Sequence, residues 1–268
     1  MNPNTEDGAA GGSYAFGDSP TAGRRLELLG QVFQPTTHAL LLGLSHDDPR
    51  IVLDLGCGPG HTTRLLSARF PEATVVGLDN SPAFIARAAR AMPGRARFTC
   101  HDVTQAPFPD APADVIFARH LLAHLREPAE LIGQWTSQLA PGGLLVLEET
   151  EWIKTADHDF TRYLDLVTEL LHARGTQLYV GQLLTSLAAP RGLSAAHRGV
   201  AMLEVTTGHA STMFSLNLAT IRNDELVEAR HPAHELDALA EALTRRTHDE
   251  QRGVITWGVS QIVLRAGP

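Results

Sequence analysis

Cysteine is scarce in this chain, with Cys57 and Cys100 as the two examples among 268 residues. Two cysteines, both in predicted ligand loops, are too few for the disulfide scaffold of a small secreted protein. The sequence has no run of about 18 apolar residues, the length that a membrane-spanning helix needs. The N-terminus also lacks the basic and then apolar segments of a signal peptide. These absences predict a cytoplasmic protein with no membrane partner.

Positive charge is also scarce. Lysine and arginine together number 22 against 30 acidic residues, which gives a net charge of −8 and a pI of about 5.9. A nucleic-acid substrate favours a basic surface, so this balance argues against one. The hydrophobic share, 43%, is ordinary for a soluble globular protein. The length allows one large domain or two small ones.

The stretch from Ile51 to Gly60 organises the chain. Its first half is a short apolar run typical of a strand that is buried on both faces. Its second half places glycine at every other position, and the residues from His61 onward are typical of a helix. A buried strand, a glycine turn and a helix direct backbone N–H groups toward a ligand. This stretch therefore predicts a ligand site.

Strand and helix patterns alternate from residue 50 to residue 150, which predicts a parallel sheet with helices on both faces. The expected strands are 51–55, 74–78, 97–99, 113–118 and 144–147. The expected helices are 61–69, one that begins at Ser81-Pro82, and 127–139. Ligands of such sheets gather at the carboxyl ends of the strands. Asp54, Asp79 and Asp102 occupy three successive strand ends, so we expect them to surround one ligand.

The remaining segments predict further elements. Residues 21–45 indicate one or two amphipathic helices after an Asp18-Ser19-Pro20 start signal. Beyond residue 150 we expect helices at about 160–171, 181–193, 211–228 and 233–246, and strands at 201–205 and 253–264.

The acid-x-Gly-x-Gly-x-Gly pattern of Asp54, Gly56, Gly58 and Gly60 resembles the first motif of class I S-adenosylmethionine-dependent methyltransferases. The dinucleotide fingerprint would instead place its third glycine at the position of His61. The segment from Arg119 to Leu125 resembles the region after the fourth strand in the ubiquinone-type, small-molecule group of that family. The likeness is good over about residues 50–150 and only in outline elsewhere.

This resemblance implies an α/β fold: a three-layer, Rossmann-like, seven-stranded and mostly parallel sheet whose last strand is antiparallel. It implies one methyltransferase domain at 13–268 after a mobile tail at 1–12. Within it lie a helical cap at 13–45, the cofactor core at 50–150, a substrate lid at 153–250 and the final strand at 253–265.

The resemblance also implies S-adenosylmethionine as cofactor and S-adenosylhomocysteine as product. Asp79 would bind both ribose hydroxyls, Asp102 the adenine amino group, and the Val103 N–H the adenine ring. The carbonyls of Gly56 and Arg119 would take the methionine ammonium. The cofactor-binding residues implied in this way are Tyr14, Asp54, Gly56, Cys57, Gly58, Asp79, Asn80, Asp102, Val103 and Arg119. For Tyr14, ordinary packing is the alternative.

Methyl transfer needs an aligned acceptor, exclusion of water and, for a hydroxyl or ammonium acceptor, a base. His120 and His124 are candidate bases because histidine titrates near neutral pH; the alternative is that they pack the loop. Their i, i+4 spacing lacks the glutamate of a His-Glu-x-x-His zinc motif, so no metal is expected.

Four residues after the fifth expected strand are candidates for the mouth of the substrate space: Glu148, Glu149, Glu151 and Trp152. Glu151 and Trp152 are the predicted substrate contacts, where charge and ring interactions could hold a cationic or aromatic acceptor. The alternative is a solvated strand end. The expected acceptor is a small organic molecule, with a secondary metabolite as one option, methylated on O, N or C.

Three other functions stay open. The same fold could bind the cofactor as a cyclase or as a silent partner, could be a nicotinamide dehydrogenase, or could methylate a nucleic acid or protein. The residues after the fourth strand lack the Asn/Asp-Pro-Pro-Tyr signature of base-modifying enzymes. The sequence leaves the oligomeric state open, with a homodimer as one option.

Overall fold

A computed structural model describes residues 17–46, 48–186 and 192–267. Within them the strands form one seven-stranded sheet in the order β3-β2-β1-β4-β5-β7-β6. All neighbours from β3 to β5 run parallel, whereas β7 is antiparallel to both β5 and β6. The strands are β1 (Ile51–Leu55), β2 (Thr74–Asp79), β3 (Arg97–Cys100), β4 (Ala113–Arg119), β5 (Leu139–Thr155), β6 (Leu193–Val205) and β7 (Ile255–Ala266). The predicted fold class is confirmed.

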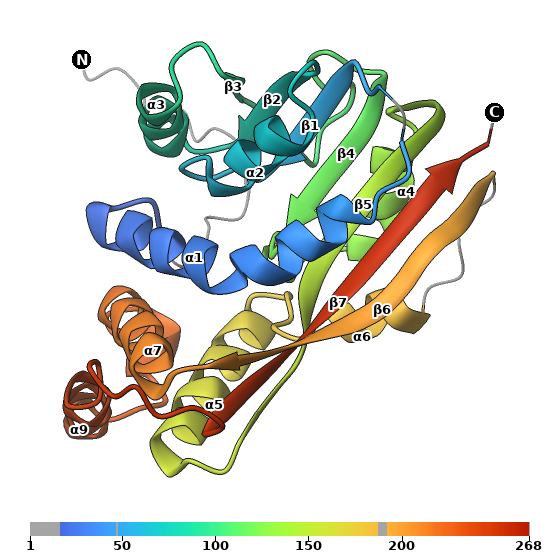
Figure 1. The fold of residues 1–268 in the computed structure, drawn as a ribbon. Coiled ribbons are helices and arrows are strands. Elements are labelled where there is room, and N and C mark those ends of the chain that lie inside the picture. Colours follow the sequence, from blue (N-terminus) through green and yellow to red (C-terminus); the bar gives the residue numbers. More distant parts are fainter. Residues whose placement is uncertain (1–16, 47, 187–191, 268) are drawn as a thin grey trace, which may run out of the picture.

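The helices cover both faces of this sheet (Figure 1). They are α1 (Pro20–Leu42), α2 (His61–Arg69), α3 (Pro82–Ala91), the 3₁₀ turn η1 (Leu122–His124), α4 (Pro128–Thr136), α5 (His158–Ala173), α6 (Gly181–Ser186), α7 (Thr207–Ile221), α8 (Glu225–Glu228) and α9 (Ala233–Thr244). The two predicted start signals are confirmed. Ser19 Oγ accepts the Ala22 N–H at 3.2 Å, and Ser81 Oγ accepts the Phe84 N–H at 3.1 Å. None of the described helices combines the length and apolarity needed to cross a membrane.

The core follows from the alternation of side chains along the strands. On one face, Leu145 and Leu147 of β5 pack with Trp135 of α4. On the other face, Val146 packs with Leu40 and Leu41 of α1. A third cluster joins α5, α7 and α9 to the first half of β7. The two faces of β5 therefore belong to different cores, and neighbouring residues at its end face different helices.

Helix α1 lies across the molecule between α2 and α7 (Figure 1). Its approach to α2 is close, because a Cβ atom at Gly30 would lie 2.9 Å from the His61 ring. Leu26 of the same helix lies over the glycine bend, 3.5 Å from where a Cβ of Gly58 would be. The segment that the sequence indicated as one or two helices is thus one helix, with Pro35 inside it, and it covers the start of α2.

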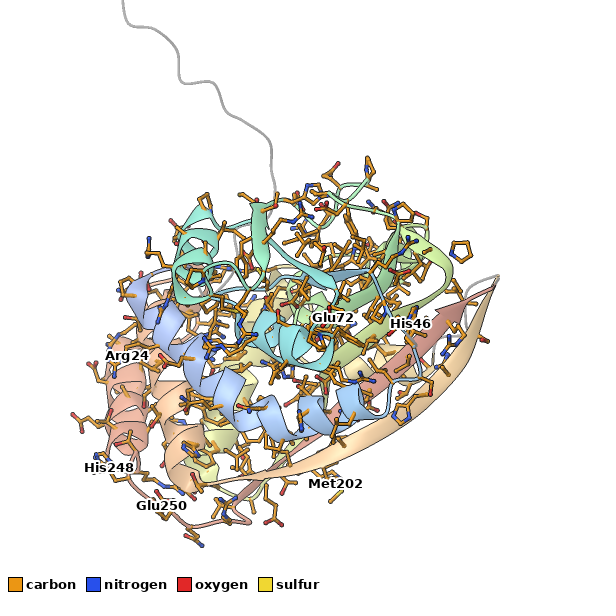
Figure 2. All side chains as sticks on the ribbon, turned by 45° about the horizontal axis from the view of Figure 1, so that its top comes forward. Arg24, His46, Glu72, Met202, His248 and Glu250 are labelled. Atoms are coloured by element: carbon orange, nitrogen blue, oxygen red, sulfur yellow. The ribbon has the colours of Figure 1, made fainter. Side chains whose placement is uncertain are left out.

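Three boundaries differ from the predictions. Strand β5 runs to Thr155, so Glu148, Glu149, Glu151 and Trp152 lie inside a strand and not after one. Glu148 and Glu149 are fully buried, so the interpretation of these two as a solvated strand end is wrong. The helix expected at 211–228 is divided into α7 and α8. Strand β6 begins at Leu193, within the expected lid range, and is an edge strand from which Met202 projects outward, 71% exposed (Figure 2).

Candidate functional site

The glycine bend between β1 and α2 has a backbone that other residues rarely adopt. Gly56, Gly58 and Gly60 have φ values of 63°, 52° and 89°, all in the left-handed region. Gly60 caps α2 without a side chain, so nothing of its own covers the first N–H groups of the helix. The Cys57 N–H donates to Leu78 O at 3.0 Å and ties the bend to β2, while the Cys57 thiol is buried.

Asp54 holds the start of α2 against β1. Its Oδ2 accepts hydrogen bonds from Thr62 Oγ1 at 2.7 Å and Thr63 Oγ1 at 2.6 Å. Its Oδ1 is buried and has no hydrogen-bond partner among the described residues. Burial raises the pKa of Asp54 to about 6, against the two threonine hydrogen bonds, which lower it. The bend therefore contains one carboxylate oxygen that could accept a further donor.

Asp79 joins the bend to α3. One carboxylate oxygen accepts the Gly58 N–H and the other accepts the Ser81 N–H, both at 2.8 Å. Burial raises the pKa of this carboxyl, and the two backbone hydrogen bonds oppose the rise. Asp79 thus contacts the glycine bend directly. Asn80, the next residue, is exposed.

Asp102 and Val103 follow β3 at the same edge of the sheet. Asp102 Oδ1 accepts from the backbone N–H of Thr104 at 2.9 Å and from its hydroxyl at 2.8 Å, which makes a local Asx turn. Val103 is buried, and its carbonyl accepts the Trp135 Nε1–H at 2.9 Å. The turn role and the proposed adenine contact are compatible, because the turn uses one of the two carboxylate oxygens.

A buried polar network connects α1 to the ends of β4, β5 and β7. Arg119 Nη1 donates to Thr37 Oγ1 at 2.9 Å, and Thr37 Oγ1 donates to Glu148 Oε2 at 2.6 Å. Gln261 Nε2 donates to Glu148 Oε1 at 2.7 Å. Burial raises the pKa of Glu148, while Arg119 lowers it. No local sequence signal indicates this network, because each of its hydrogen bonds joins residues more than 80 positions apart in the chain.

The candidate bases His120 and His124 are held in a neutral state. Burial lowers the pKa of His120 to about 3, with a further contribution from Arg119. Burial also lowers the pKa of His124 to about 3, with a contribution from Arg25 of α1. The His120 ring packs edge-on against Phe33, with 4.6 Å between ring centroids. Such imidazoles are weak bases, so a role as general base needs a change of environment when ligands bind.

This state of the histidines gives a prediction for NMR. Because burial penalises the imidazolium ion, the ring signals of His120 and His124 should not show the shift of imidazole protonation between pH 7 and pH 5 in the ligand-free protein. Histidine-selective spectra with His120→Gln and His124→Gln variants would assign the signals. A shift of either signal with a midpoint between pH 6 and pH 7 would contradict the predicted burial.

The sequence predicts Glu149 after the fifth strand, at the mouth of the substrate space, whereas the structure has it inside β5. Its carboxylate is buried beneath the turn after β4, where Oε1 accepts the N–H groups of Leu121 at 2.8 Å and Leu122 at 2.7 Å. Burial raises its pKa to about 8, with the N–H donors lowering it. The sequence pattern Glu148-Glu149 is strongly polar, so it does not indicate a buried strand end.

The predicted substrate contacts, Glu151 and Trp152, lie away from the network around Arg119. Glu151 sits at a bulge of β5 and its carboxylate faces Thr185 of α6, with 3.4 Å between Oε1 and Oγ1. The Trp152 indole lies against Gly258, and Lys154 Nζ lies 4.4 Å from its ring centroid. Neither contact joins the network around Arg119. Tyr14 lies outside the described residues.

The arrangement fits S-adenosylmethionine by its charge. That cofactor is net positive, with a sulfonium and an ammonium against one carboxylate, and the carboxyls of Asp54 and Asp79 lie at two strand ends, with an uncommitted Asp54 oxygen. A diphosphate would meet the same carboxyls with unfavourable charge. At Gly58 no side chain of the bend covers the backbone, and Leu26 lies opposite, 3.5 Å from the position of a Cβ.

Comparison with known proteins agrees with this geometry. A family model described as a methyltransferase domain matches residues 52–143. A trans-aconitate 2-methyltransferase from Methylobacterium nodulans is 42% identical over 114 residues, which cover 42% of this chain and 43% of that protein. The chain thus matches less than half the length of such curated relatives.

Solved structures show the same fold. A putative methyltransferase from Bacillus halodurans has a TM-score of 0.59 at 17% identity, and the match covers 87% of this chain and 100% of that one. The [4+2]-cyclase SpnF has a TM-score of 0.54 at 22% identity, and the match covers 88% and 82%. The matched segment, the glycine bend and the sheet order thus make the chain similar to class I S-adenosylmethionine-dependent methyltransferases, whose fold it shares.

Proposed function

We propose that this protein transfers the methyl group of S-adenosylmethionine to an O, N or C atom of a small organic molecule. The observation that carries the proposal is the contact of Asp79 with the Gly58 N–H, which joins the acid of the second strand to the glycine bend. This contact sets a carboxylate beside the glycine backbone at the edge where parallel sheets bind ligands. The match over residues 52–143 supports the same conclusion.

In this proposal each part of the site has its own task. Asp79 would bind the ribose hydroxyls, Asp102 and Val103 the adenine, and the carbonyls of Gly56 and Arg119 the ammonium. The cofactor supplies an activated methyl group when it is bound. The chain's residues must then align the acceptor and exclude water, and α1, which lies across the bend, would do so as the helical cap of a single domain. The helices between residues 153 and 250 would form the lid.

We propose an organic anion as the acceptor, in place of the cationic or aromatic acceptor expected at Glu151 and Trp152, because those two side chains face Thr185 and Lys154. Arg25 is buried on α1, and its charge lowers the pKa values of both His120 and His124. A positive potential beside two neutral imidazoles favours a negatively charged acceptor. The relatives named for trans-aconitate methylation make that tricarboxylate the first acceptor to test, although the match to them covers less than half of their length. A secondary metabolite is the further option.

The decisive experiment uses S-adenosylmethionine with a labelled methyl group. The protein is incubated with trans-aconitate and, separately, with metabolite extracts. We expect release of S-adenosylhomocysteine together with one added methyl mass on an acceptor. Binding of the cofactor with an altered product but no added methyl would support the cyclase alternative. Failure to bind S-adenosylmethionine or S-adenosylhomocysteine would refute the proposal.

A single substitution tests the proposed cofactor contact. Asp79→Ala removes the acceptor of the Gly58 N–H and the group proposed for the ribose, so the Kd for S-adenosylhomocysteine should rise about 10- to 100-fold. Isothermal titration calorimetry measures this change. Glu72→Ala, at an exposed acid between α2 and β2, is the matched control and should bind as the wild type does. Equal affinity of both variants would contradict the assignment of Asp79.

A further inference from the structure

The turn after β4 is held by two consecutive residues of β5. The His120 N–H donates to Glu148 O at 2.8 Å, and the next two N–H groups, of Leu121 and Leu122, both donate to Glu149 Oε1. Glu149 is fully buried, and its Oε2 has no hydrogen-bond partner in the part of the chain that the structure describes. One side-chain oxygen thus satisfies two buried backbone donors.

This turn has a backbone that needs support. His120 has a φ of 51°, in the left-handed region that non-glycine residues seldom occupy. Such a conformation persists only where the surroundings hold it. The residues that hold it from below are Glu148, through its carbonyl, and Glu149, through its carboxylate.

The same turn contacts both the glycine bend and helix α1, which lies across that bend. The Leu121 side chain packs against Gly56, with its Cδ1 2.7 Å from where a Cβ of that glycine would be. The His120 ring packs against Phe33 of α1. A displacement of the turn would therefore move two groups together: the Leu121 side chain, which packs against the glycine bend, and the ring of His120, the candidate base.

We infer that Glu149 is a positioning residue, whose carboxyl oxygen fixes the 120–122 turn and, through Leu121, the wall of the cofactor site. This inference rests on the proposed function, because it assigns a role to a group that supports the same site. Glu149 itself lies beneath the turn, so the role is indirect.

Simple core filling is the competing explanation, and two substitutions separate it from positioning. Glu149→Gln keeps an oxygen that can accept both N–H groups. Glu149→Met keeps a similar volume but leaves both donors buried without an acceptor, which is costly. If Glu149 only fills space, both variants should behave alike. If Glu149 positions the turn, the glutamine variant should keep the affinity for S-adenosylhomocysteine and the methionine variant should lose it.

Calorimetric titration with S-adenosylhomocysteine is the test. We expect Glu149→Gln to bind within about threefold of the wild type and Glu149→Met to bind about tenfold or more weakly. Glu204→Gln, at an exposed acid of the edge strand β6, is the control and should bind as the wild type does. Wild-type affinity in the methionine variant, or a more than tenfold loss in the glutamine variant, would overturn the inference.

A second measurement does not depend on the methionine variant being folded. In ¹⁵N-resolved spectra of the wild type, the amide signals of Leu121 and Leu122 should shift with a common midpoint near pH 8, because burial raises the pKa of Glu149 to that value. Glu148 raises this pKa further, whereas the N–H groups of Leu121, Leu122 and Ala123 lower it. The shift should be absent in Glu149→Gln. Amide signals that respond to pH identically in the wild type and in Glu149→Gln would show that the carboxyl does not contact these N–H groups, and would overturn the inference.

The outcomes also separate this inference from the proposed function. A wild-type protein that binds neither S-adenosylmethionine nor S-adenosylhomocysteine refutes the function, and with it the role of Glu149 at that site. A wild-type protein that binds, together with variants that all bind equally, refutes the positioning role alone.

Discussion

Replacing Gly56 by alanine should weaken S-adenosylhomocysteine binding at least tenfold and lower the free energy of unfolding. The backbone at this position has a φ of 63°, and a left-handed conformation costs a non-glycine residue about 1–2 kcal/mol. The added Cβ would also lie 2.7 Å from Leu121 Cδ1. Overpacking of this kind costs about 1–3 kcal/mol more. Leu121 cannot move freely, because Glu149 holds its N–H.

A second glycine separates these two contributions. Gly94, between α3 and β3, has a φ of 70°, but nothing lies within 4 Å of its potential Cβ. Gly94→Ala should therefore lose only the backbone contribution and keep its affinity for S-adenosylhomocysteine. Thermal unfolding and calorimetry on the two variants give the comparison. If Gly56→Ala and Gly94→Ala lose equal stability and both bind normally, the contact with Leu121 does not matter to the site.

The part of the site that the sequence could predict is encoded locally. The glycine bend follows directly from the spacing of Gly56, Gly58 and Gly60, because each takes a φ that glycine alone adopts easily. Asp54 and Asp79 end two neighbouring strands, and parallel pairing brings such ends to one edge. The helix boundaries at Ser19 and Ser81 depend on a side chain and an N–H three residues apart. None of these features needs information from a distant segment.

The features that the sequence could not predict depend on distant partners. Glu148 and Glu149 are polar, and polar residues usually mark the end of a buried strand. They remain inside β5 because Thr37 and Gln261, 111 and 113 residues away, pair with the first, while the N–H groups of the turn pair with the second. Burial by these same segments changes the chemistry of the site, since it raises the pKa of Glu149.

The histidines show the same limit. Their spacing and position suggest a base at the acceptor end, and an exposed histidine there would titrate near neutral pH. The ring of His120 instead packs edge-on against Phe33 of α1, and Arg25 of the same helix adds positive charge near both imidazoles. The helix that decides their protonation lies about 90 residues earlier in the chain. Periodicity predicted that helix but could not place it.

The pKa of Glu149 predicts an unusual dependence of stability on pH. Its folded-state pKa of about 8 lies above the ordinary value of 4.5, so between these values the folded protein binds more protons than the unfolded chain. Stability from this group therefore falls as the pH rises through that range. Each pKa unit corresponds to about 1.4 kcal/mol. At pH 7 the unfolded chain has ionised Glu149 and the folded protein has not, so this carboxyl lowers the free energy of unfolding by about 3 kcal/mol relative to a permanently neutral group.

Glu149→Gln is the neutral counterpart, because its carbonyl can accept the same two N–H groups and its amide replaces the protonated Oε2. Relative to the wild type, the glutamine variant should gain stability as the pH rises from 5 to 7, by about 2–3 kcal/mol or several degrees in Tm. Asp54, with a pKa of about 6, and the histidines, with pKa values of about 3, also titrate on unfolding in part of this range. They are unchanged in the variant, so the difference between the two proteins isolates Glu149. A difference in Tm that stays constant from pH 5 to pH 8 would show that this carboxyl is not neutral in the folded protein.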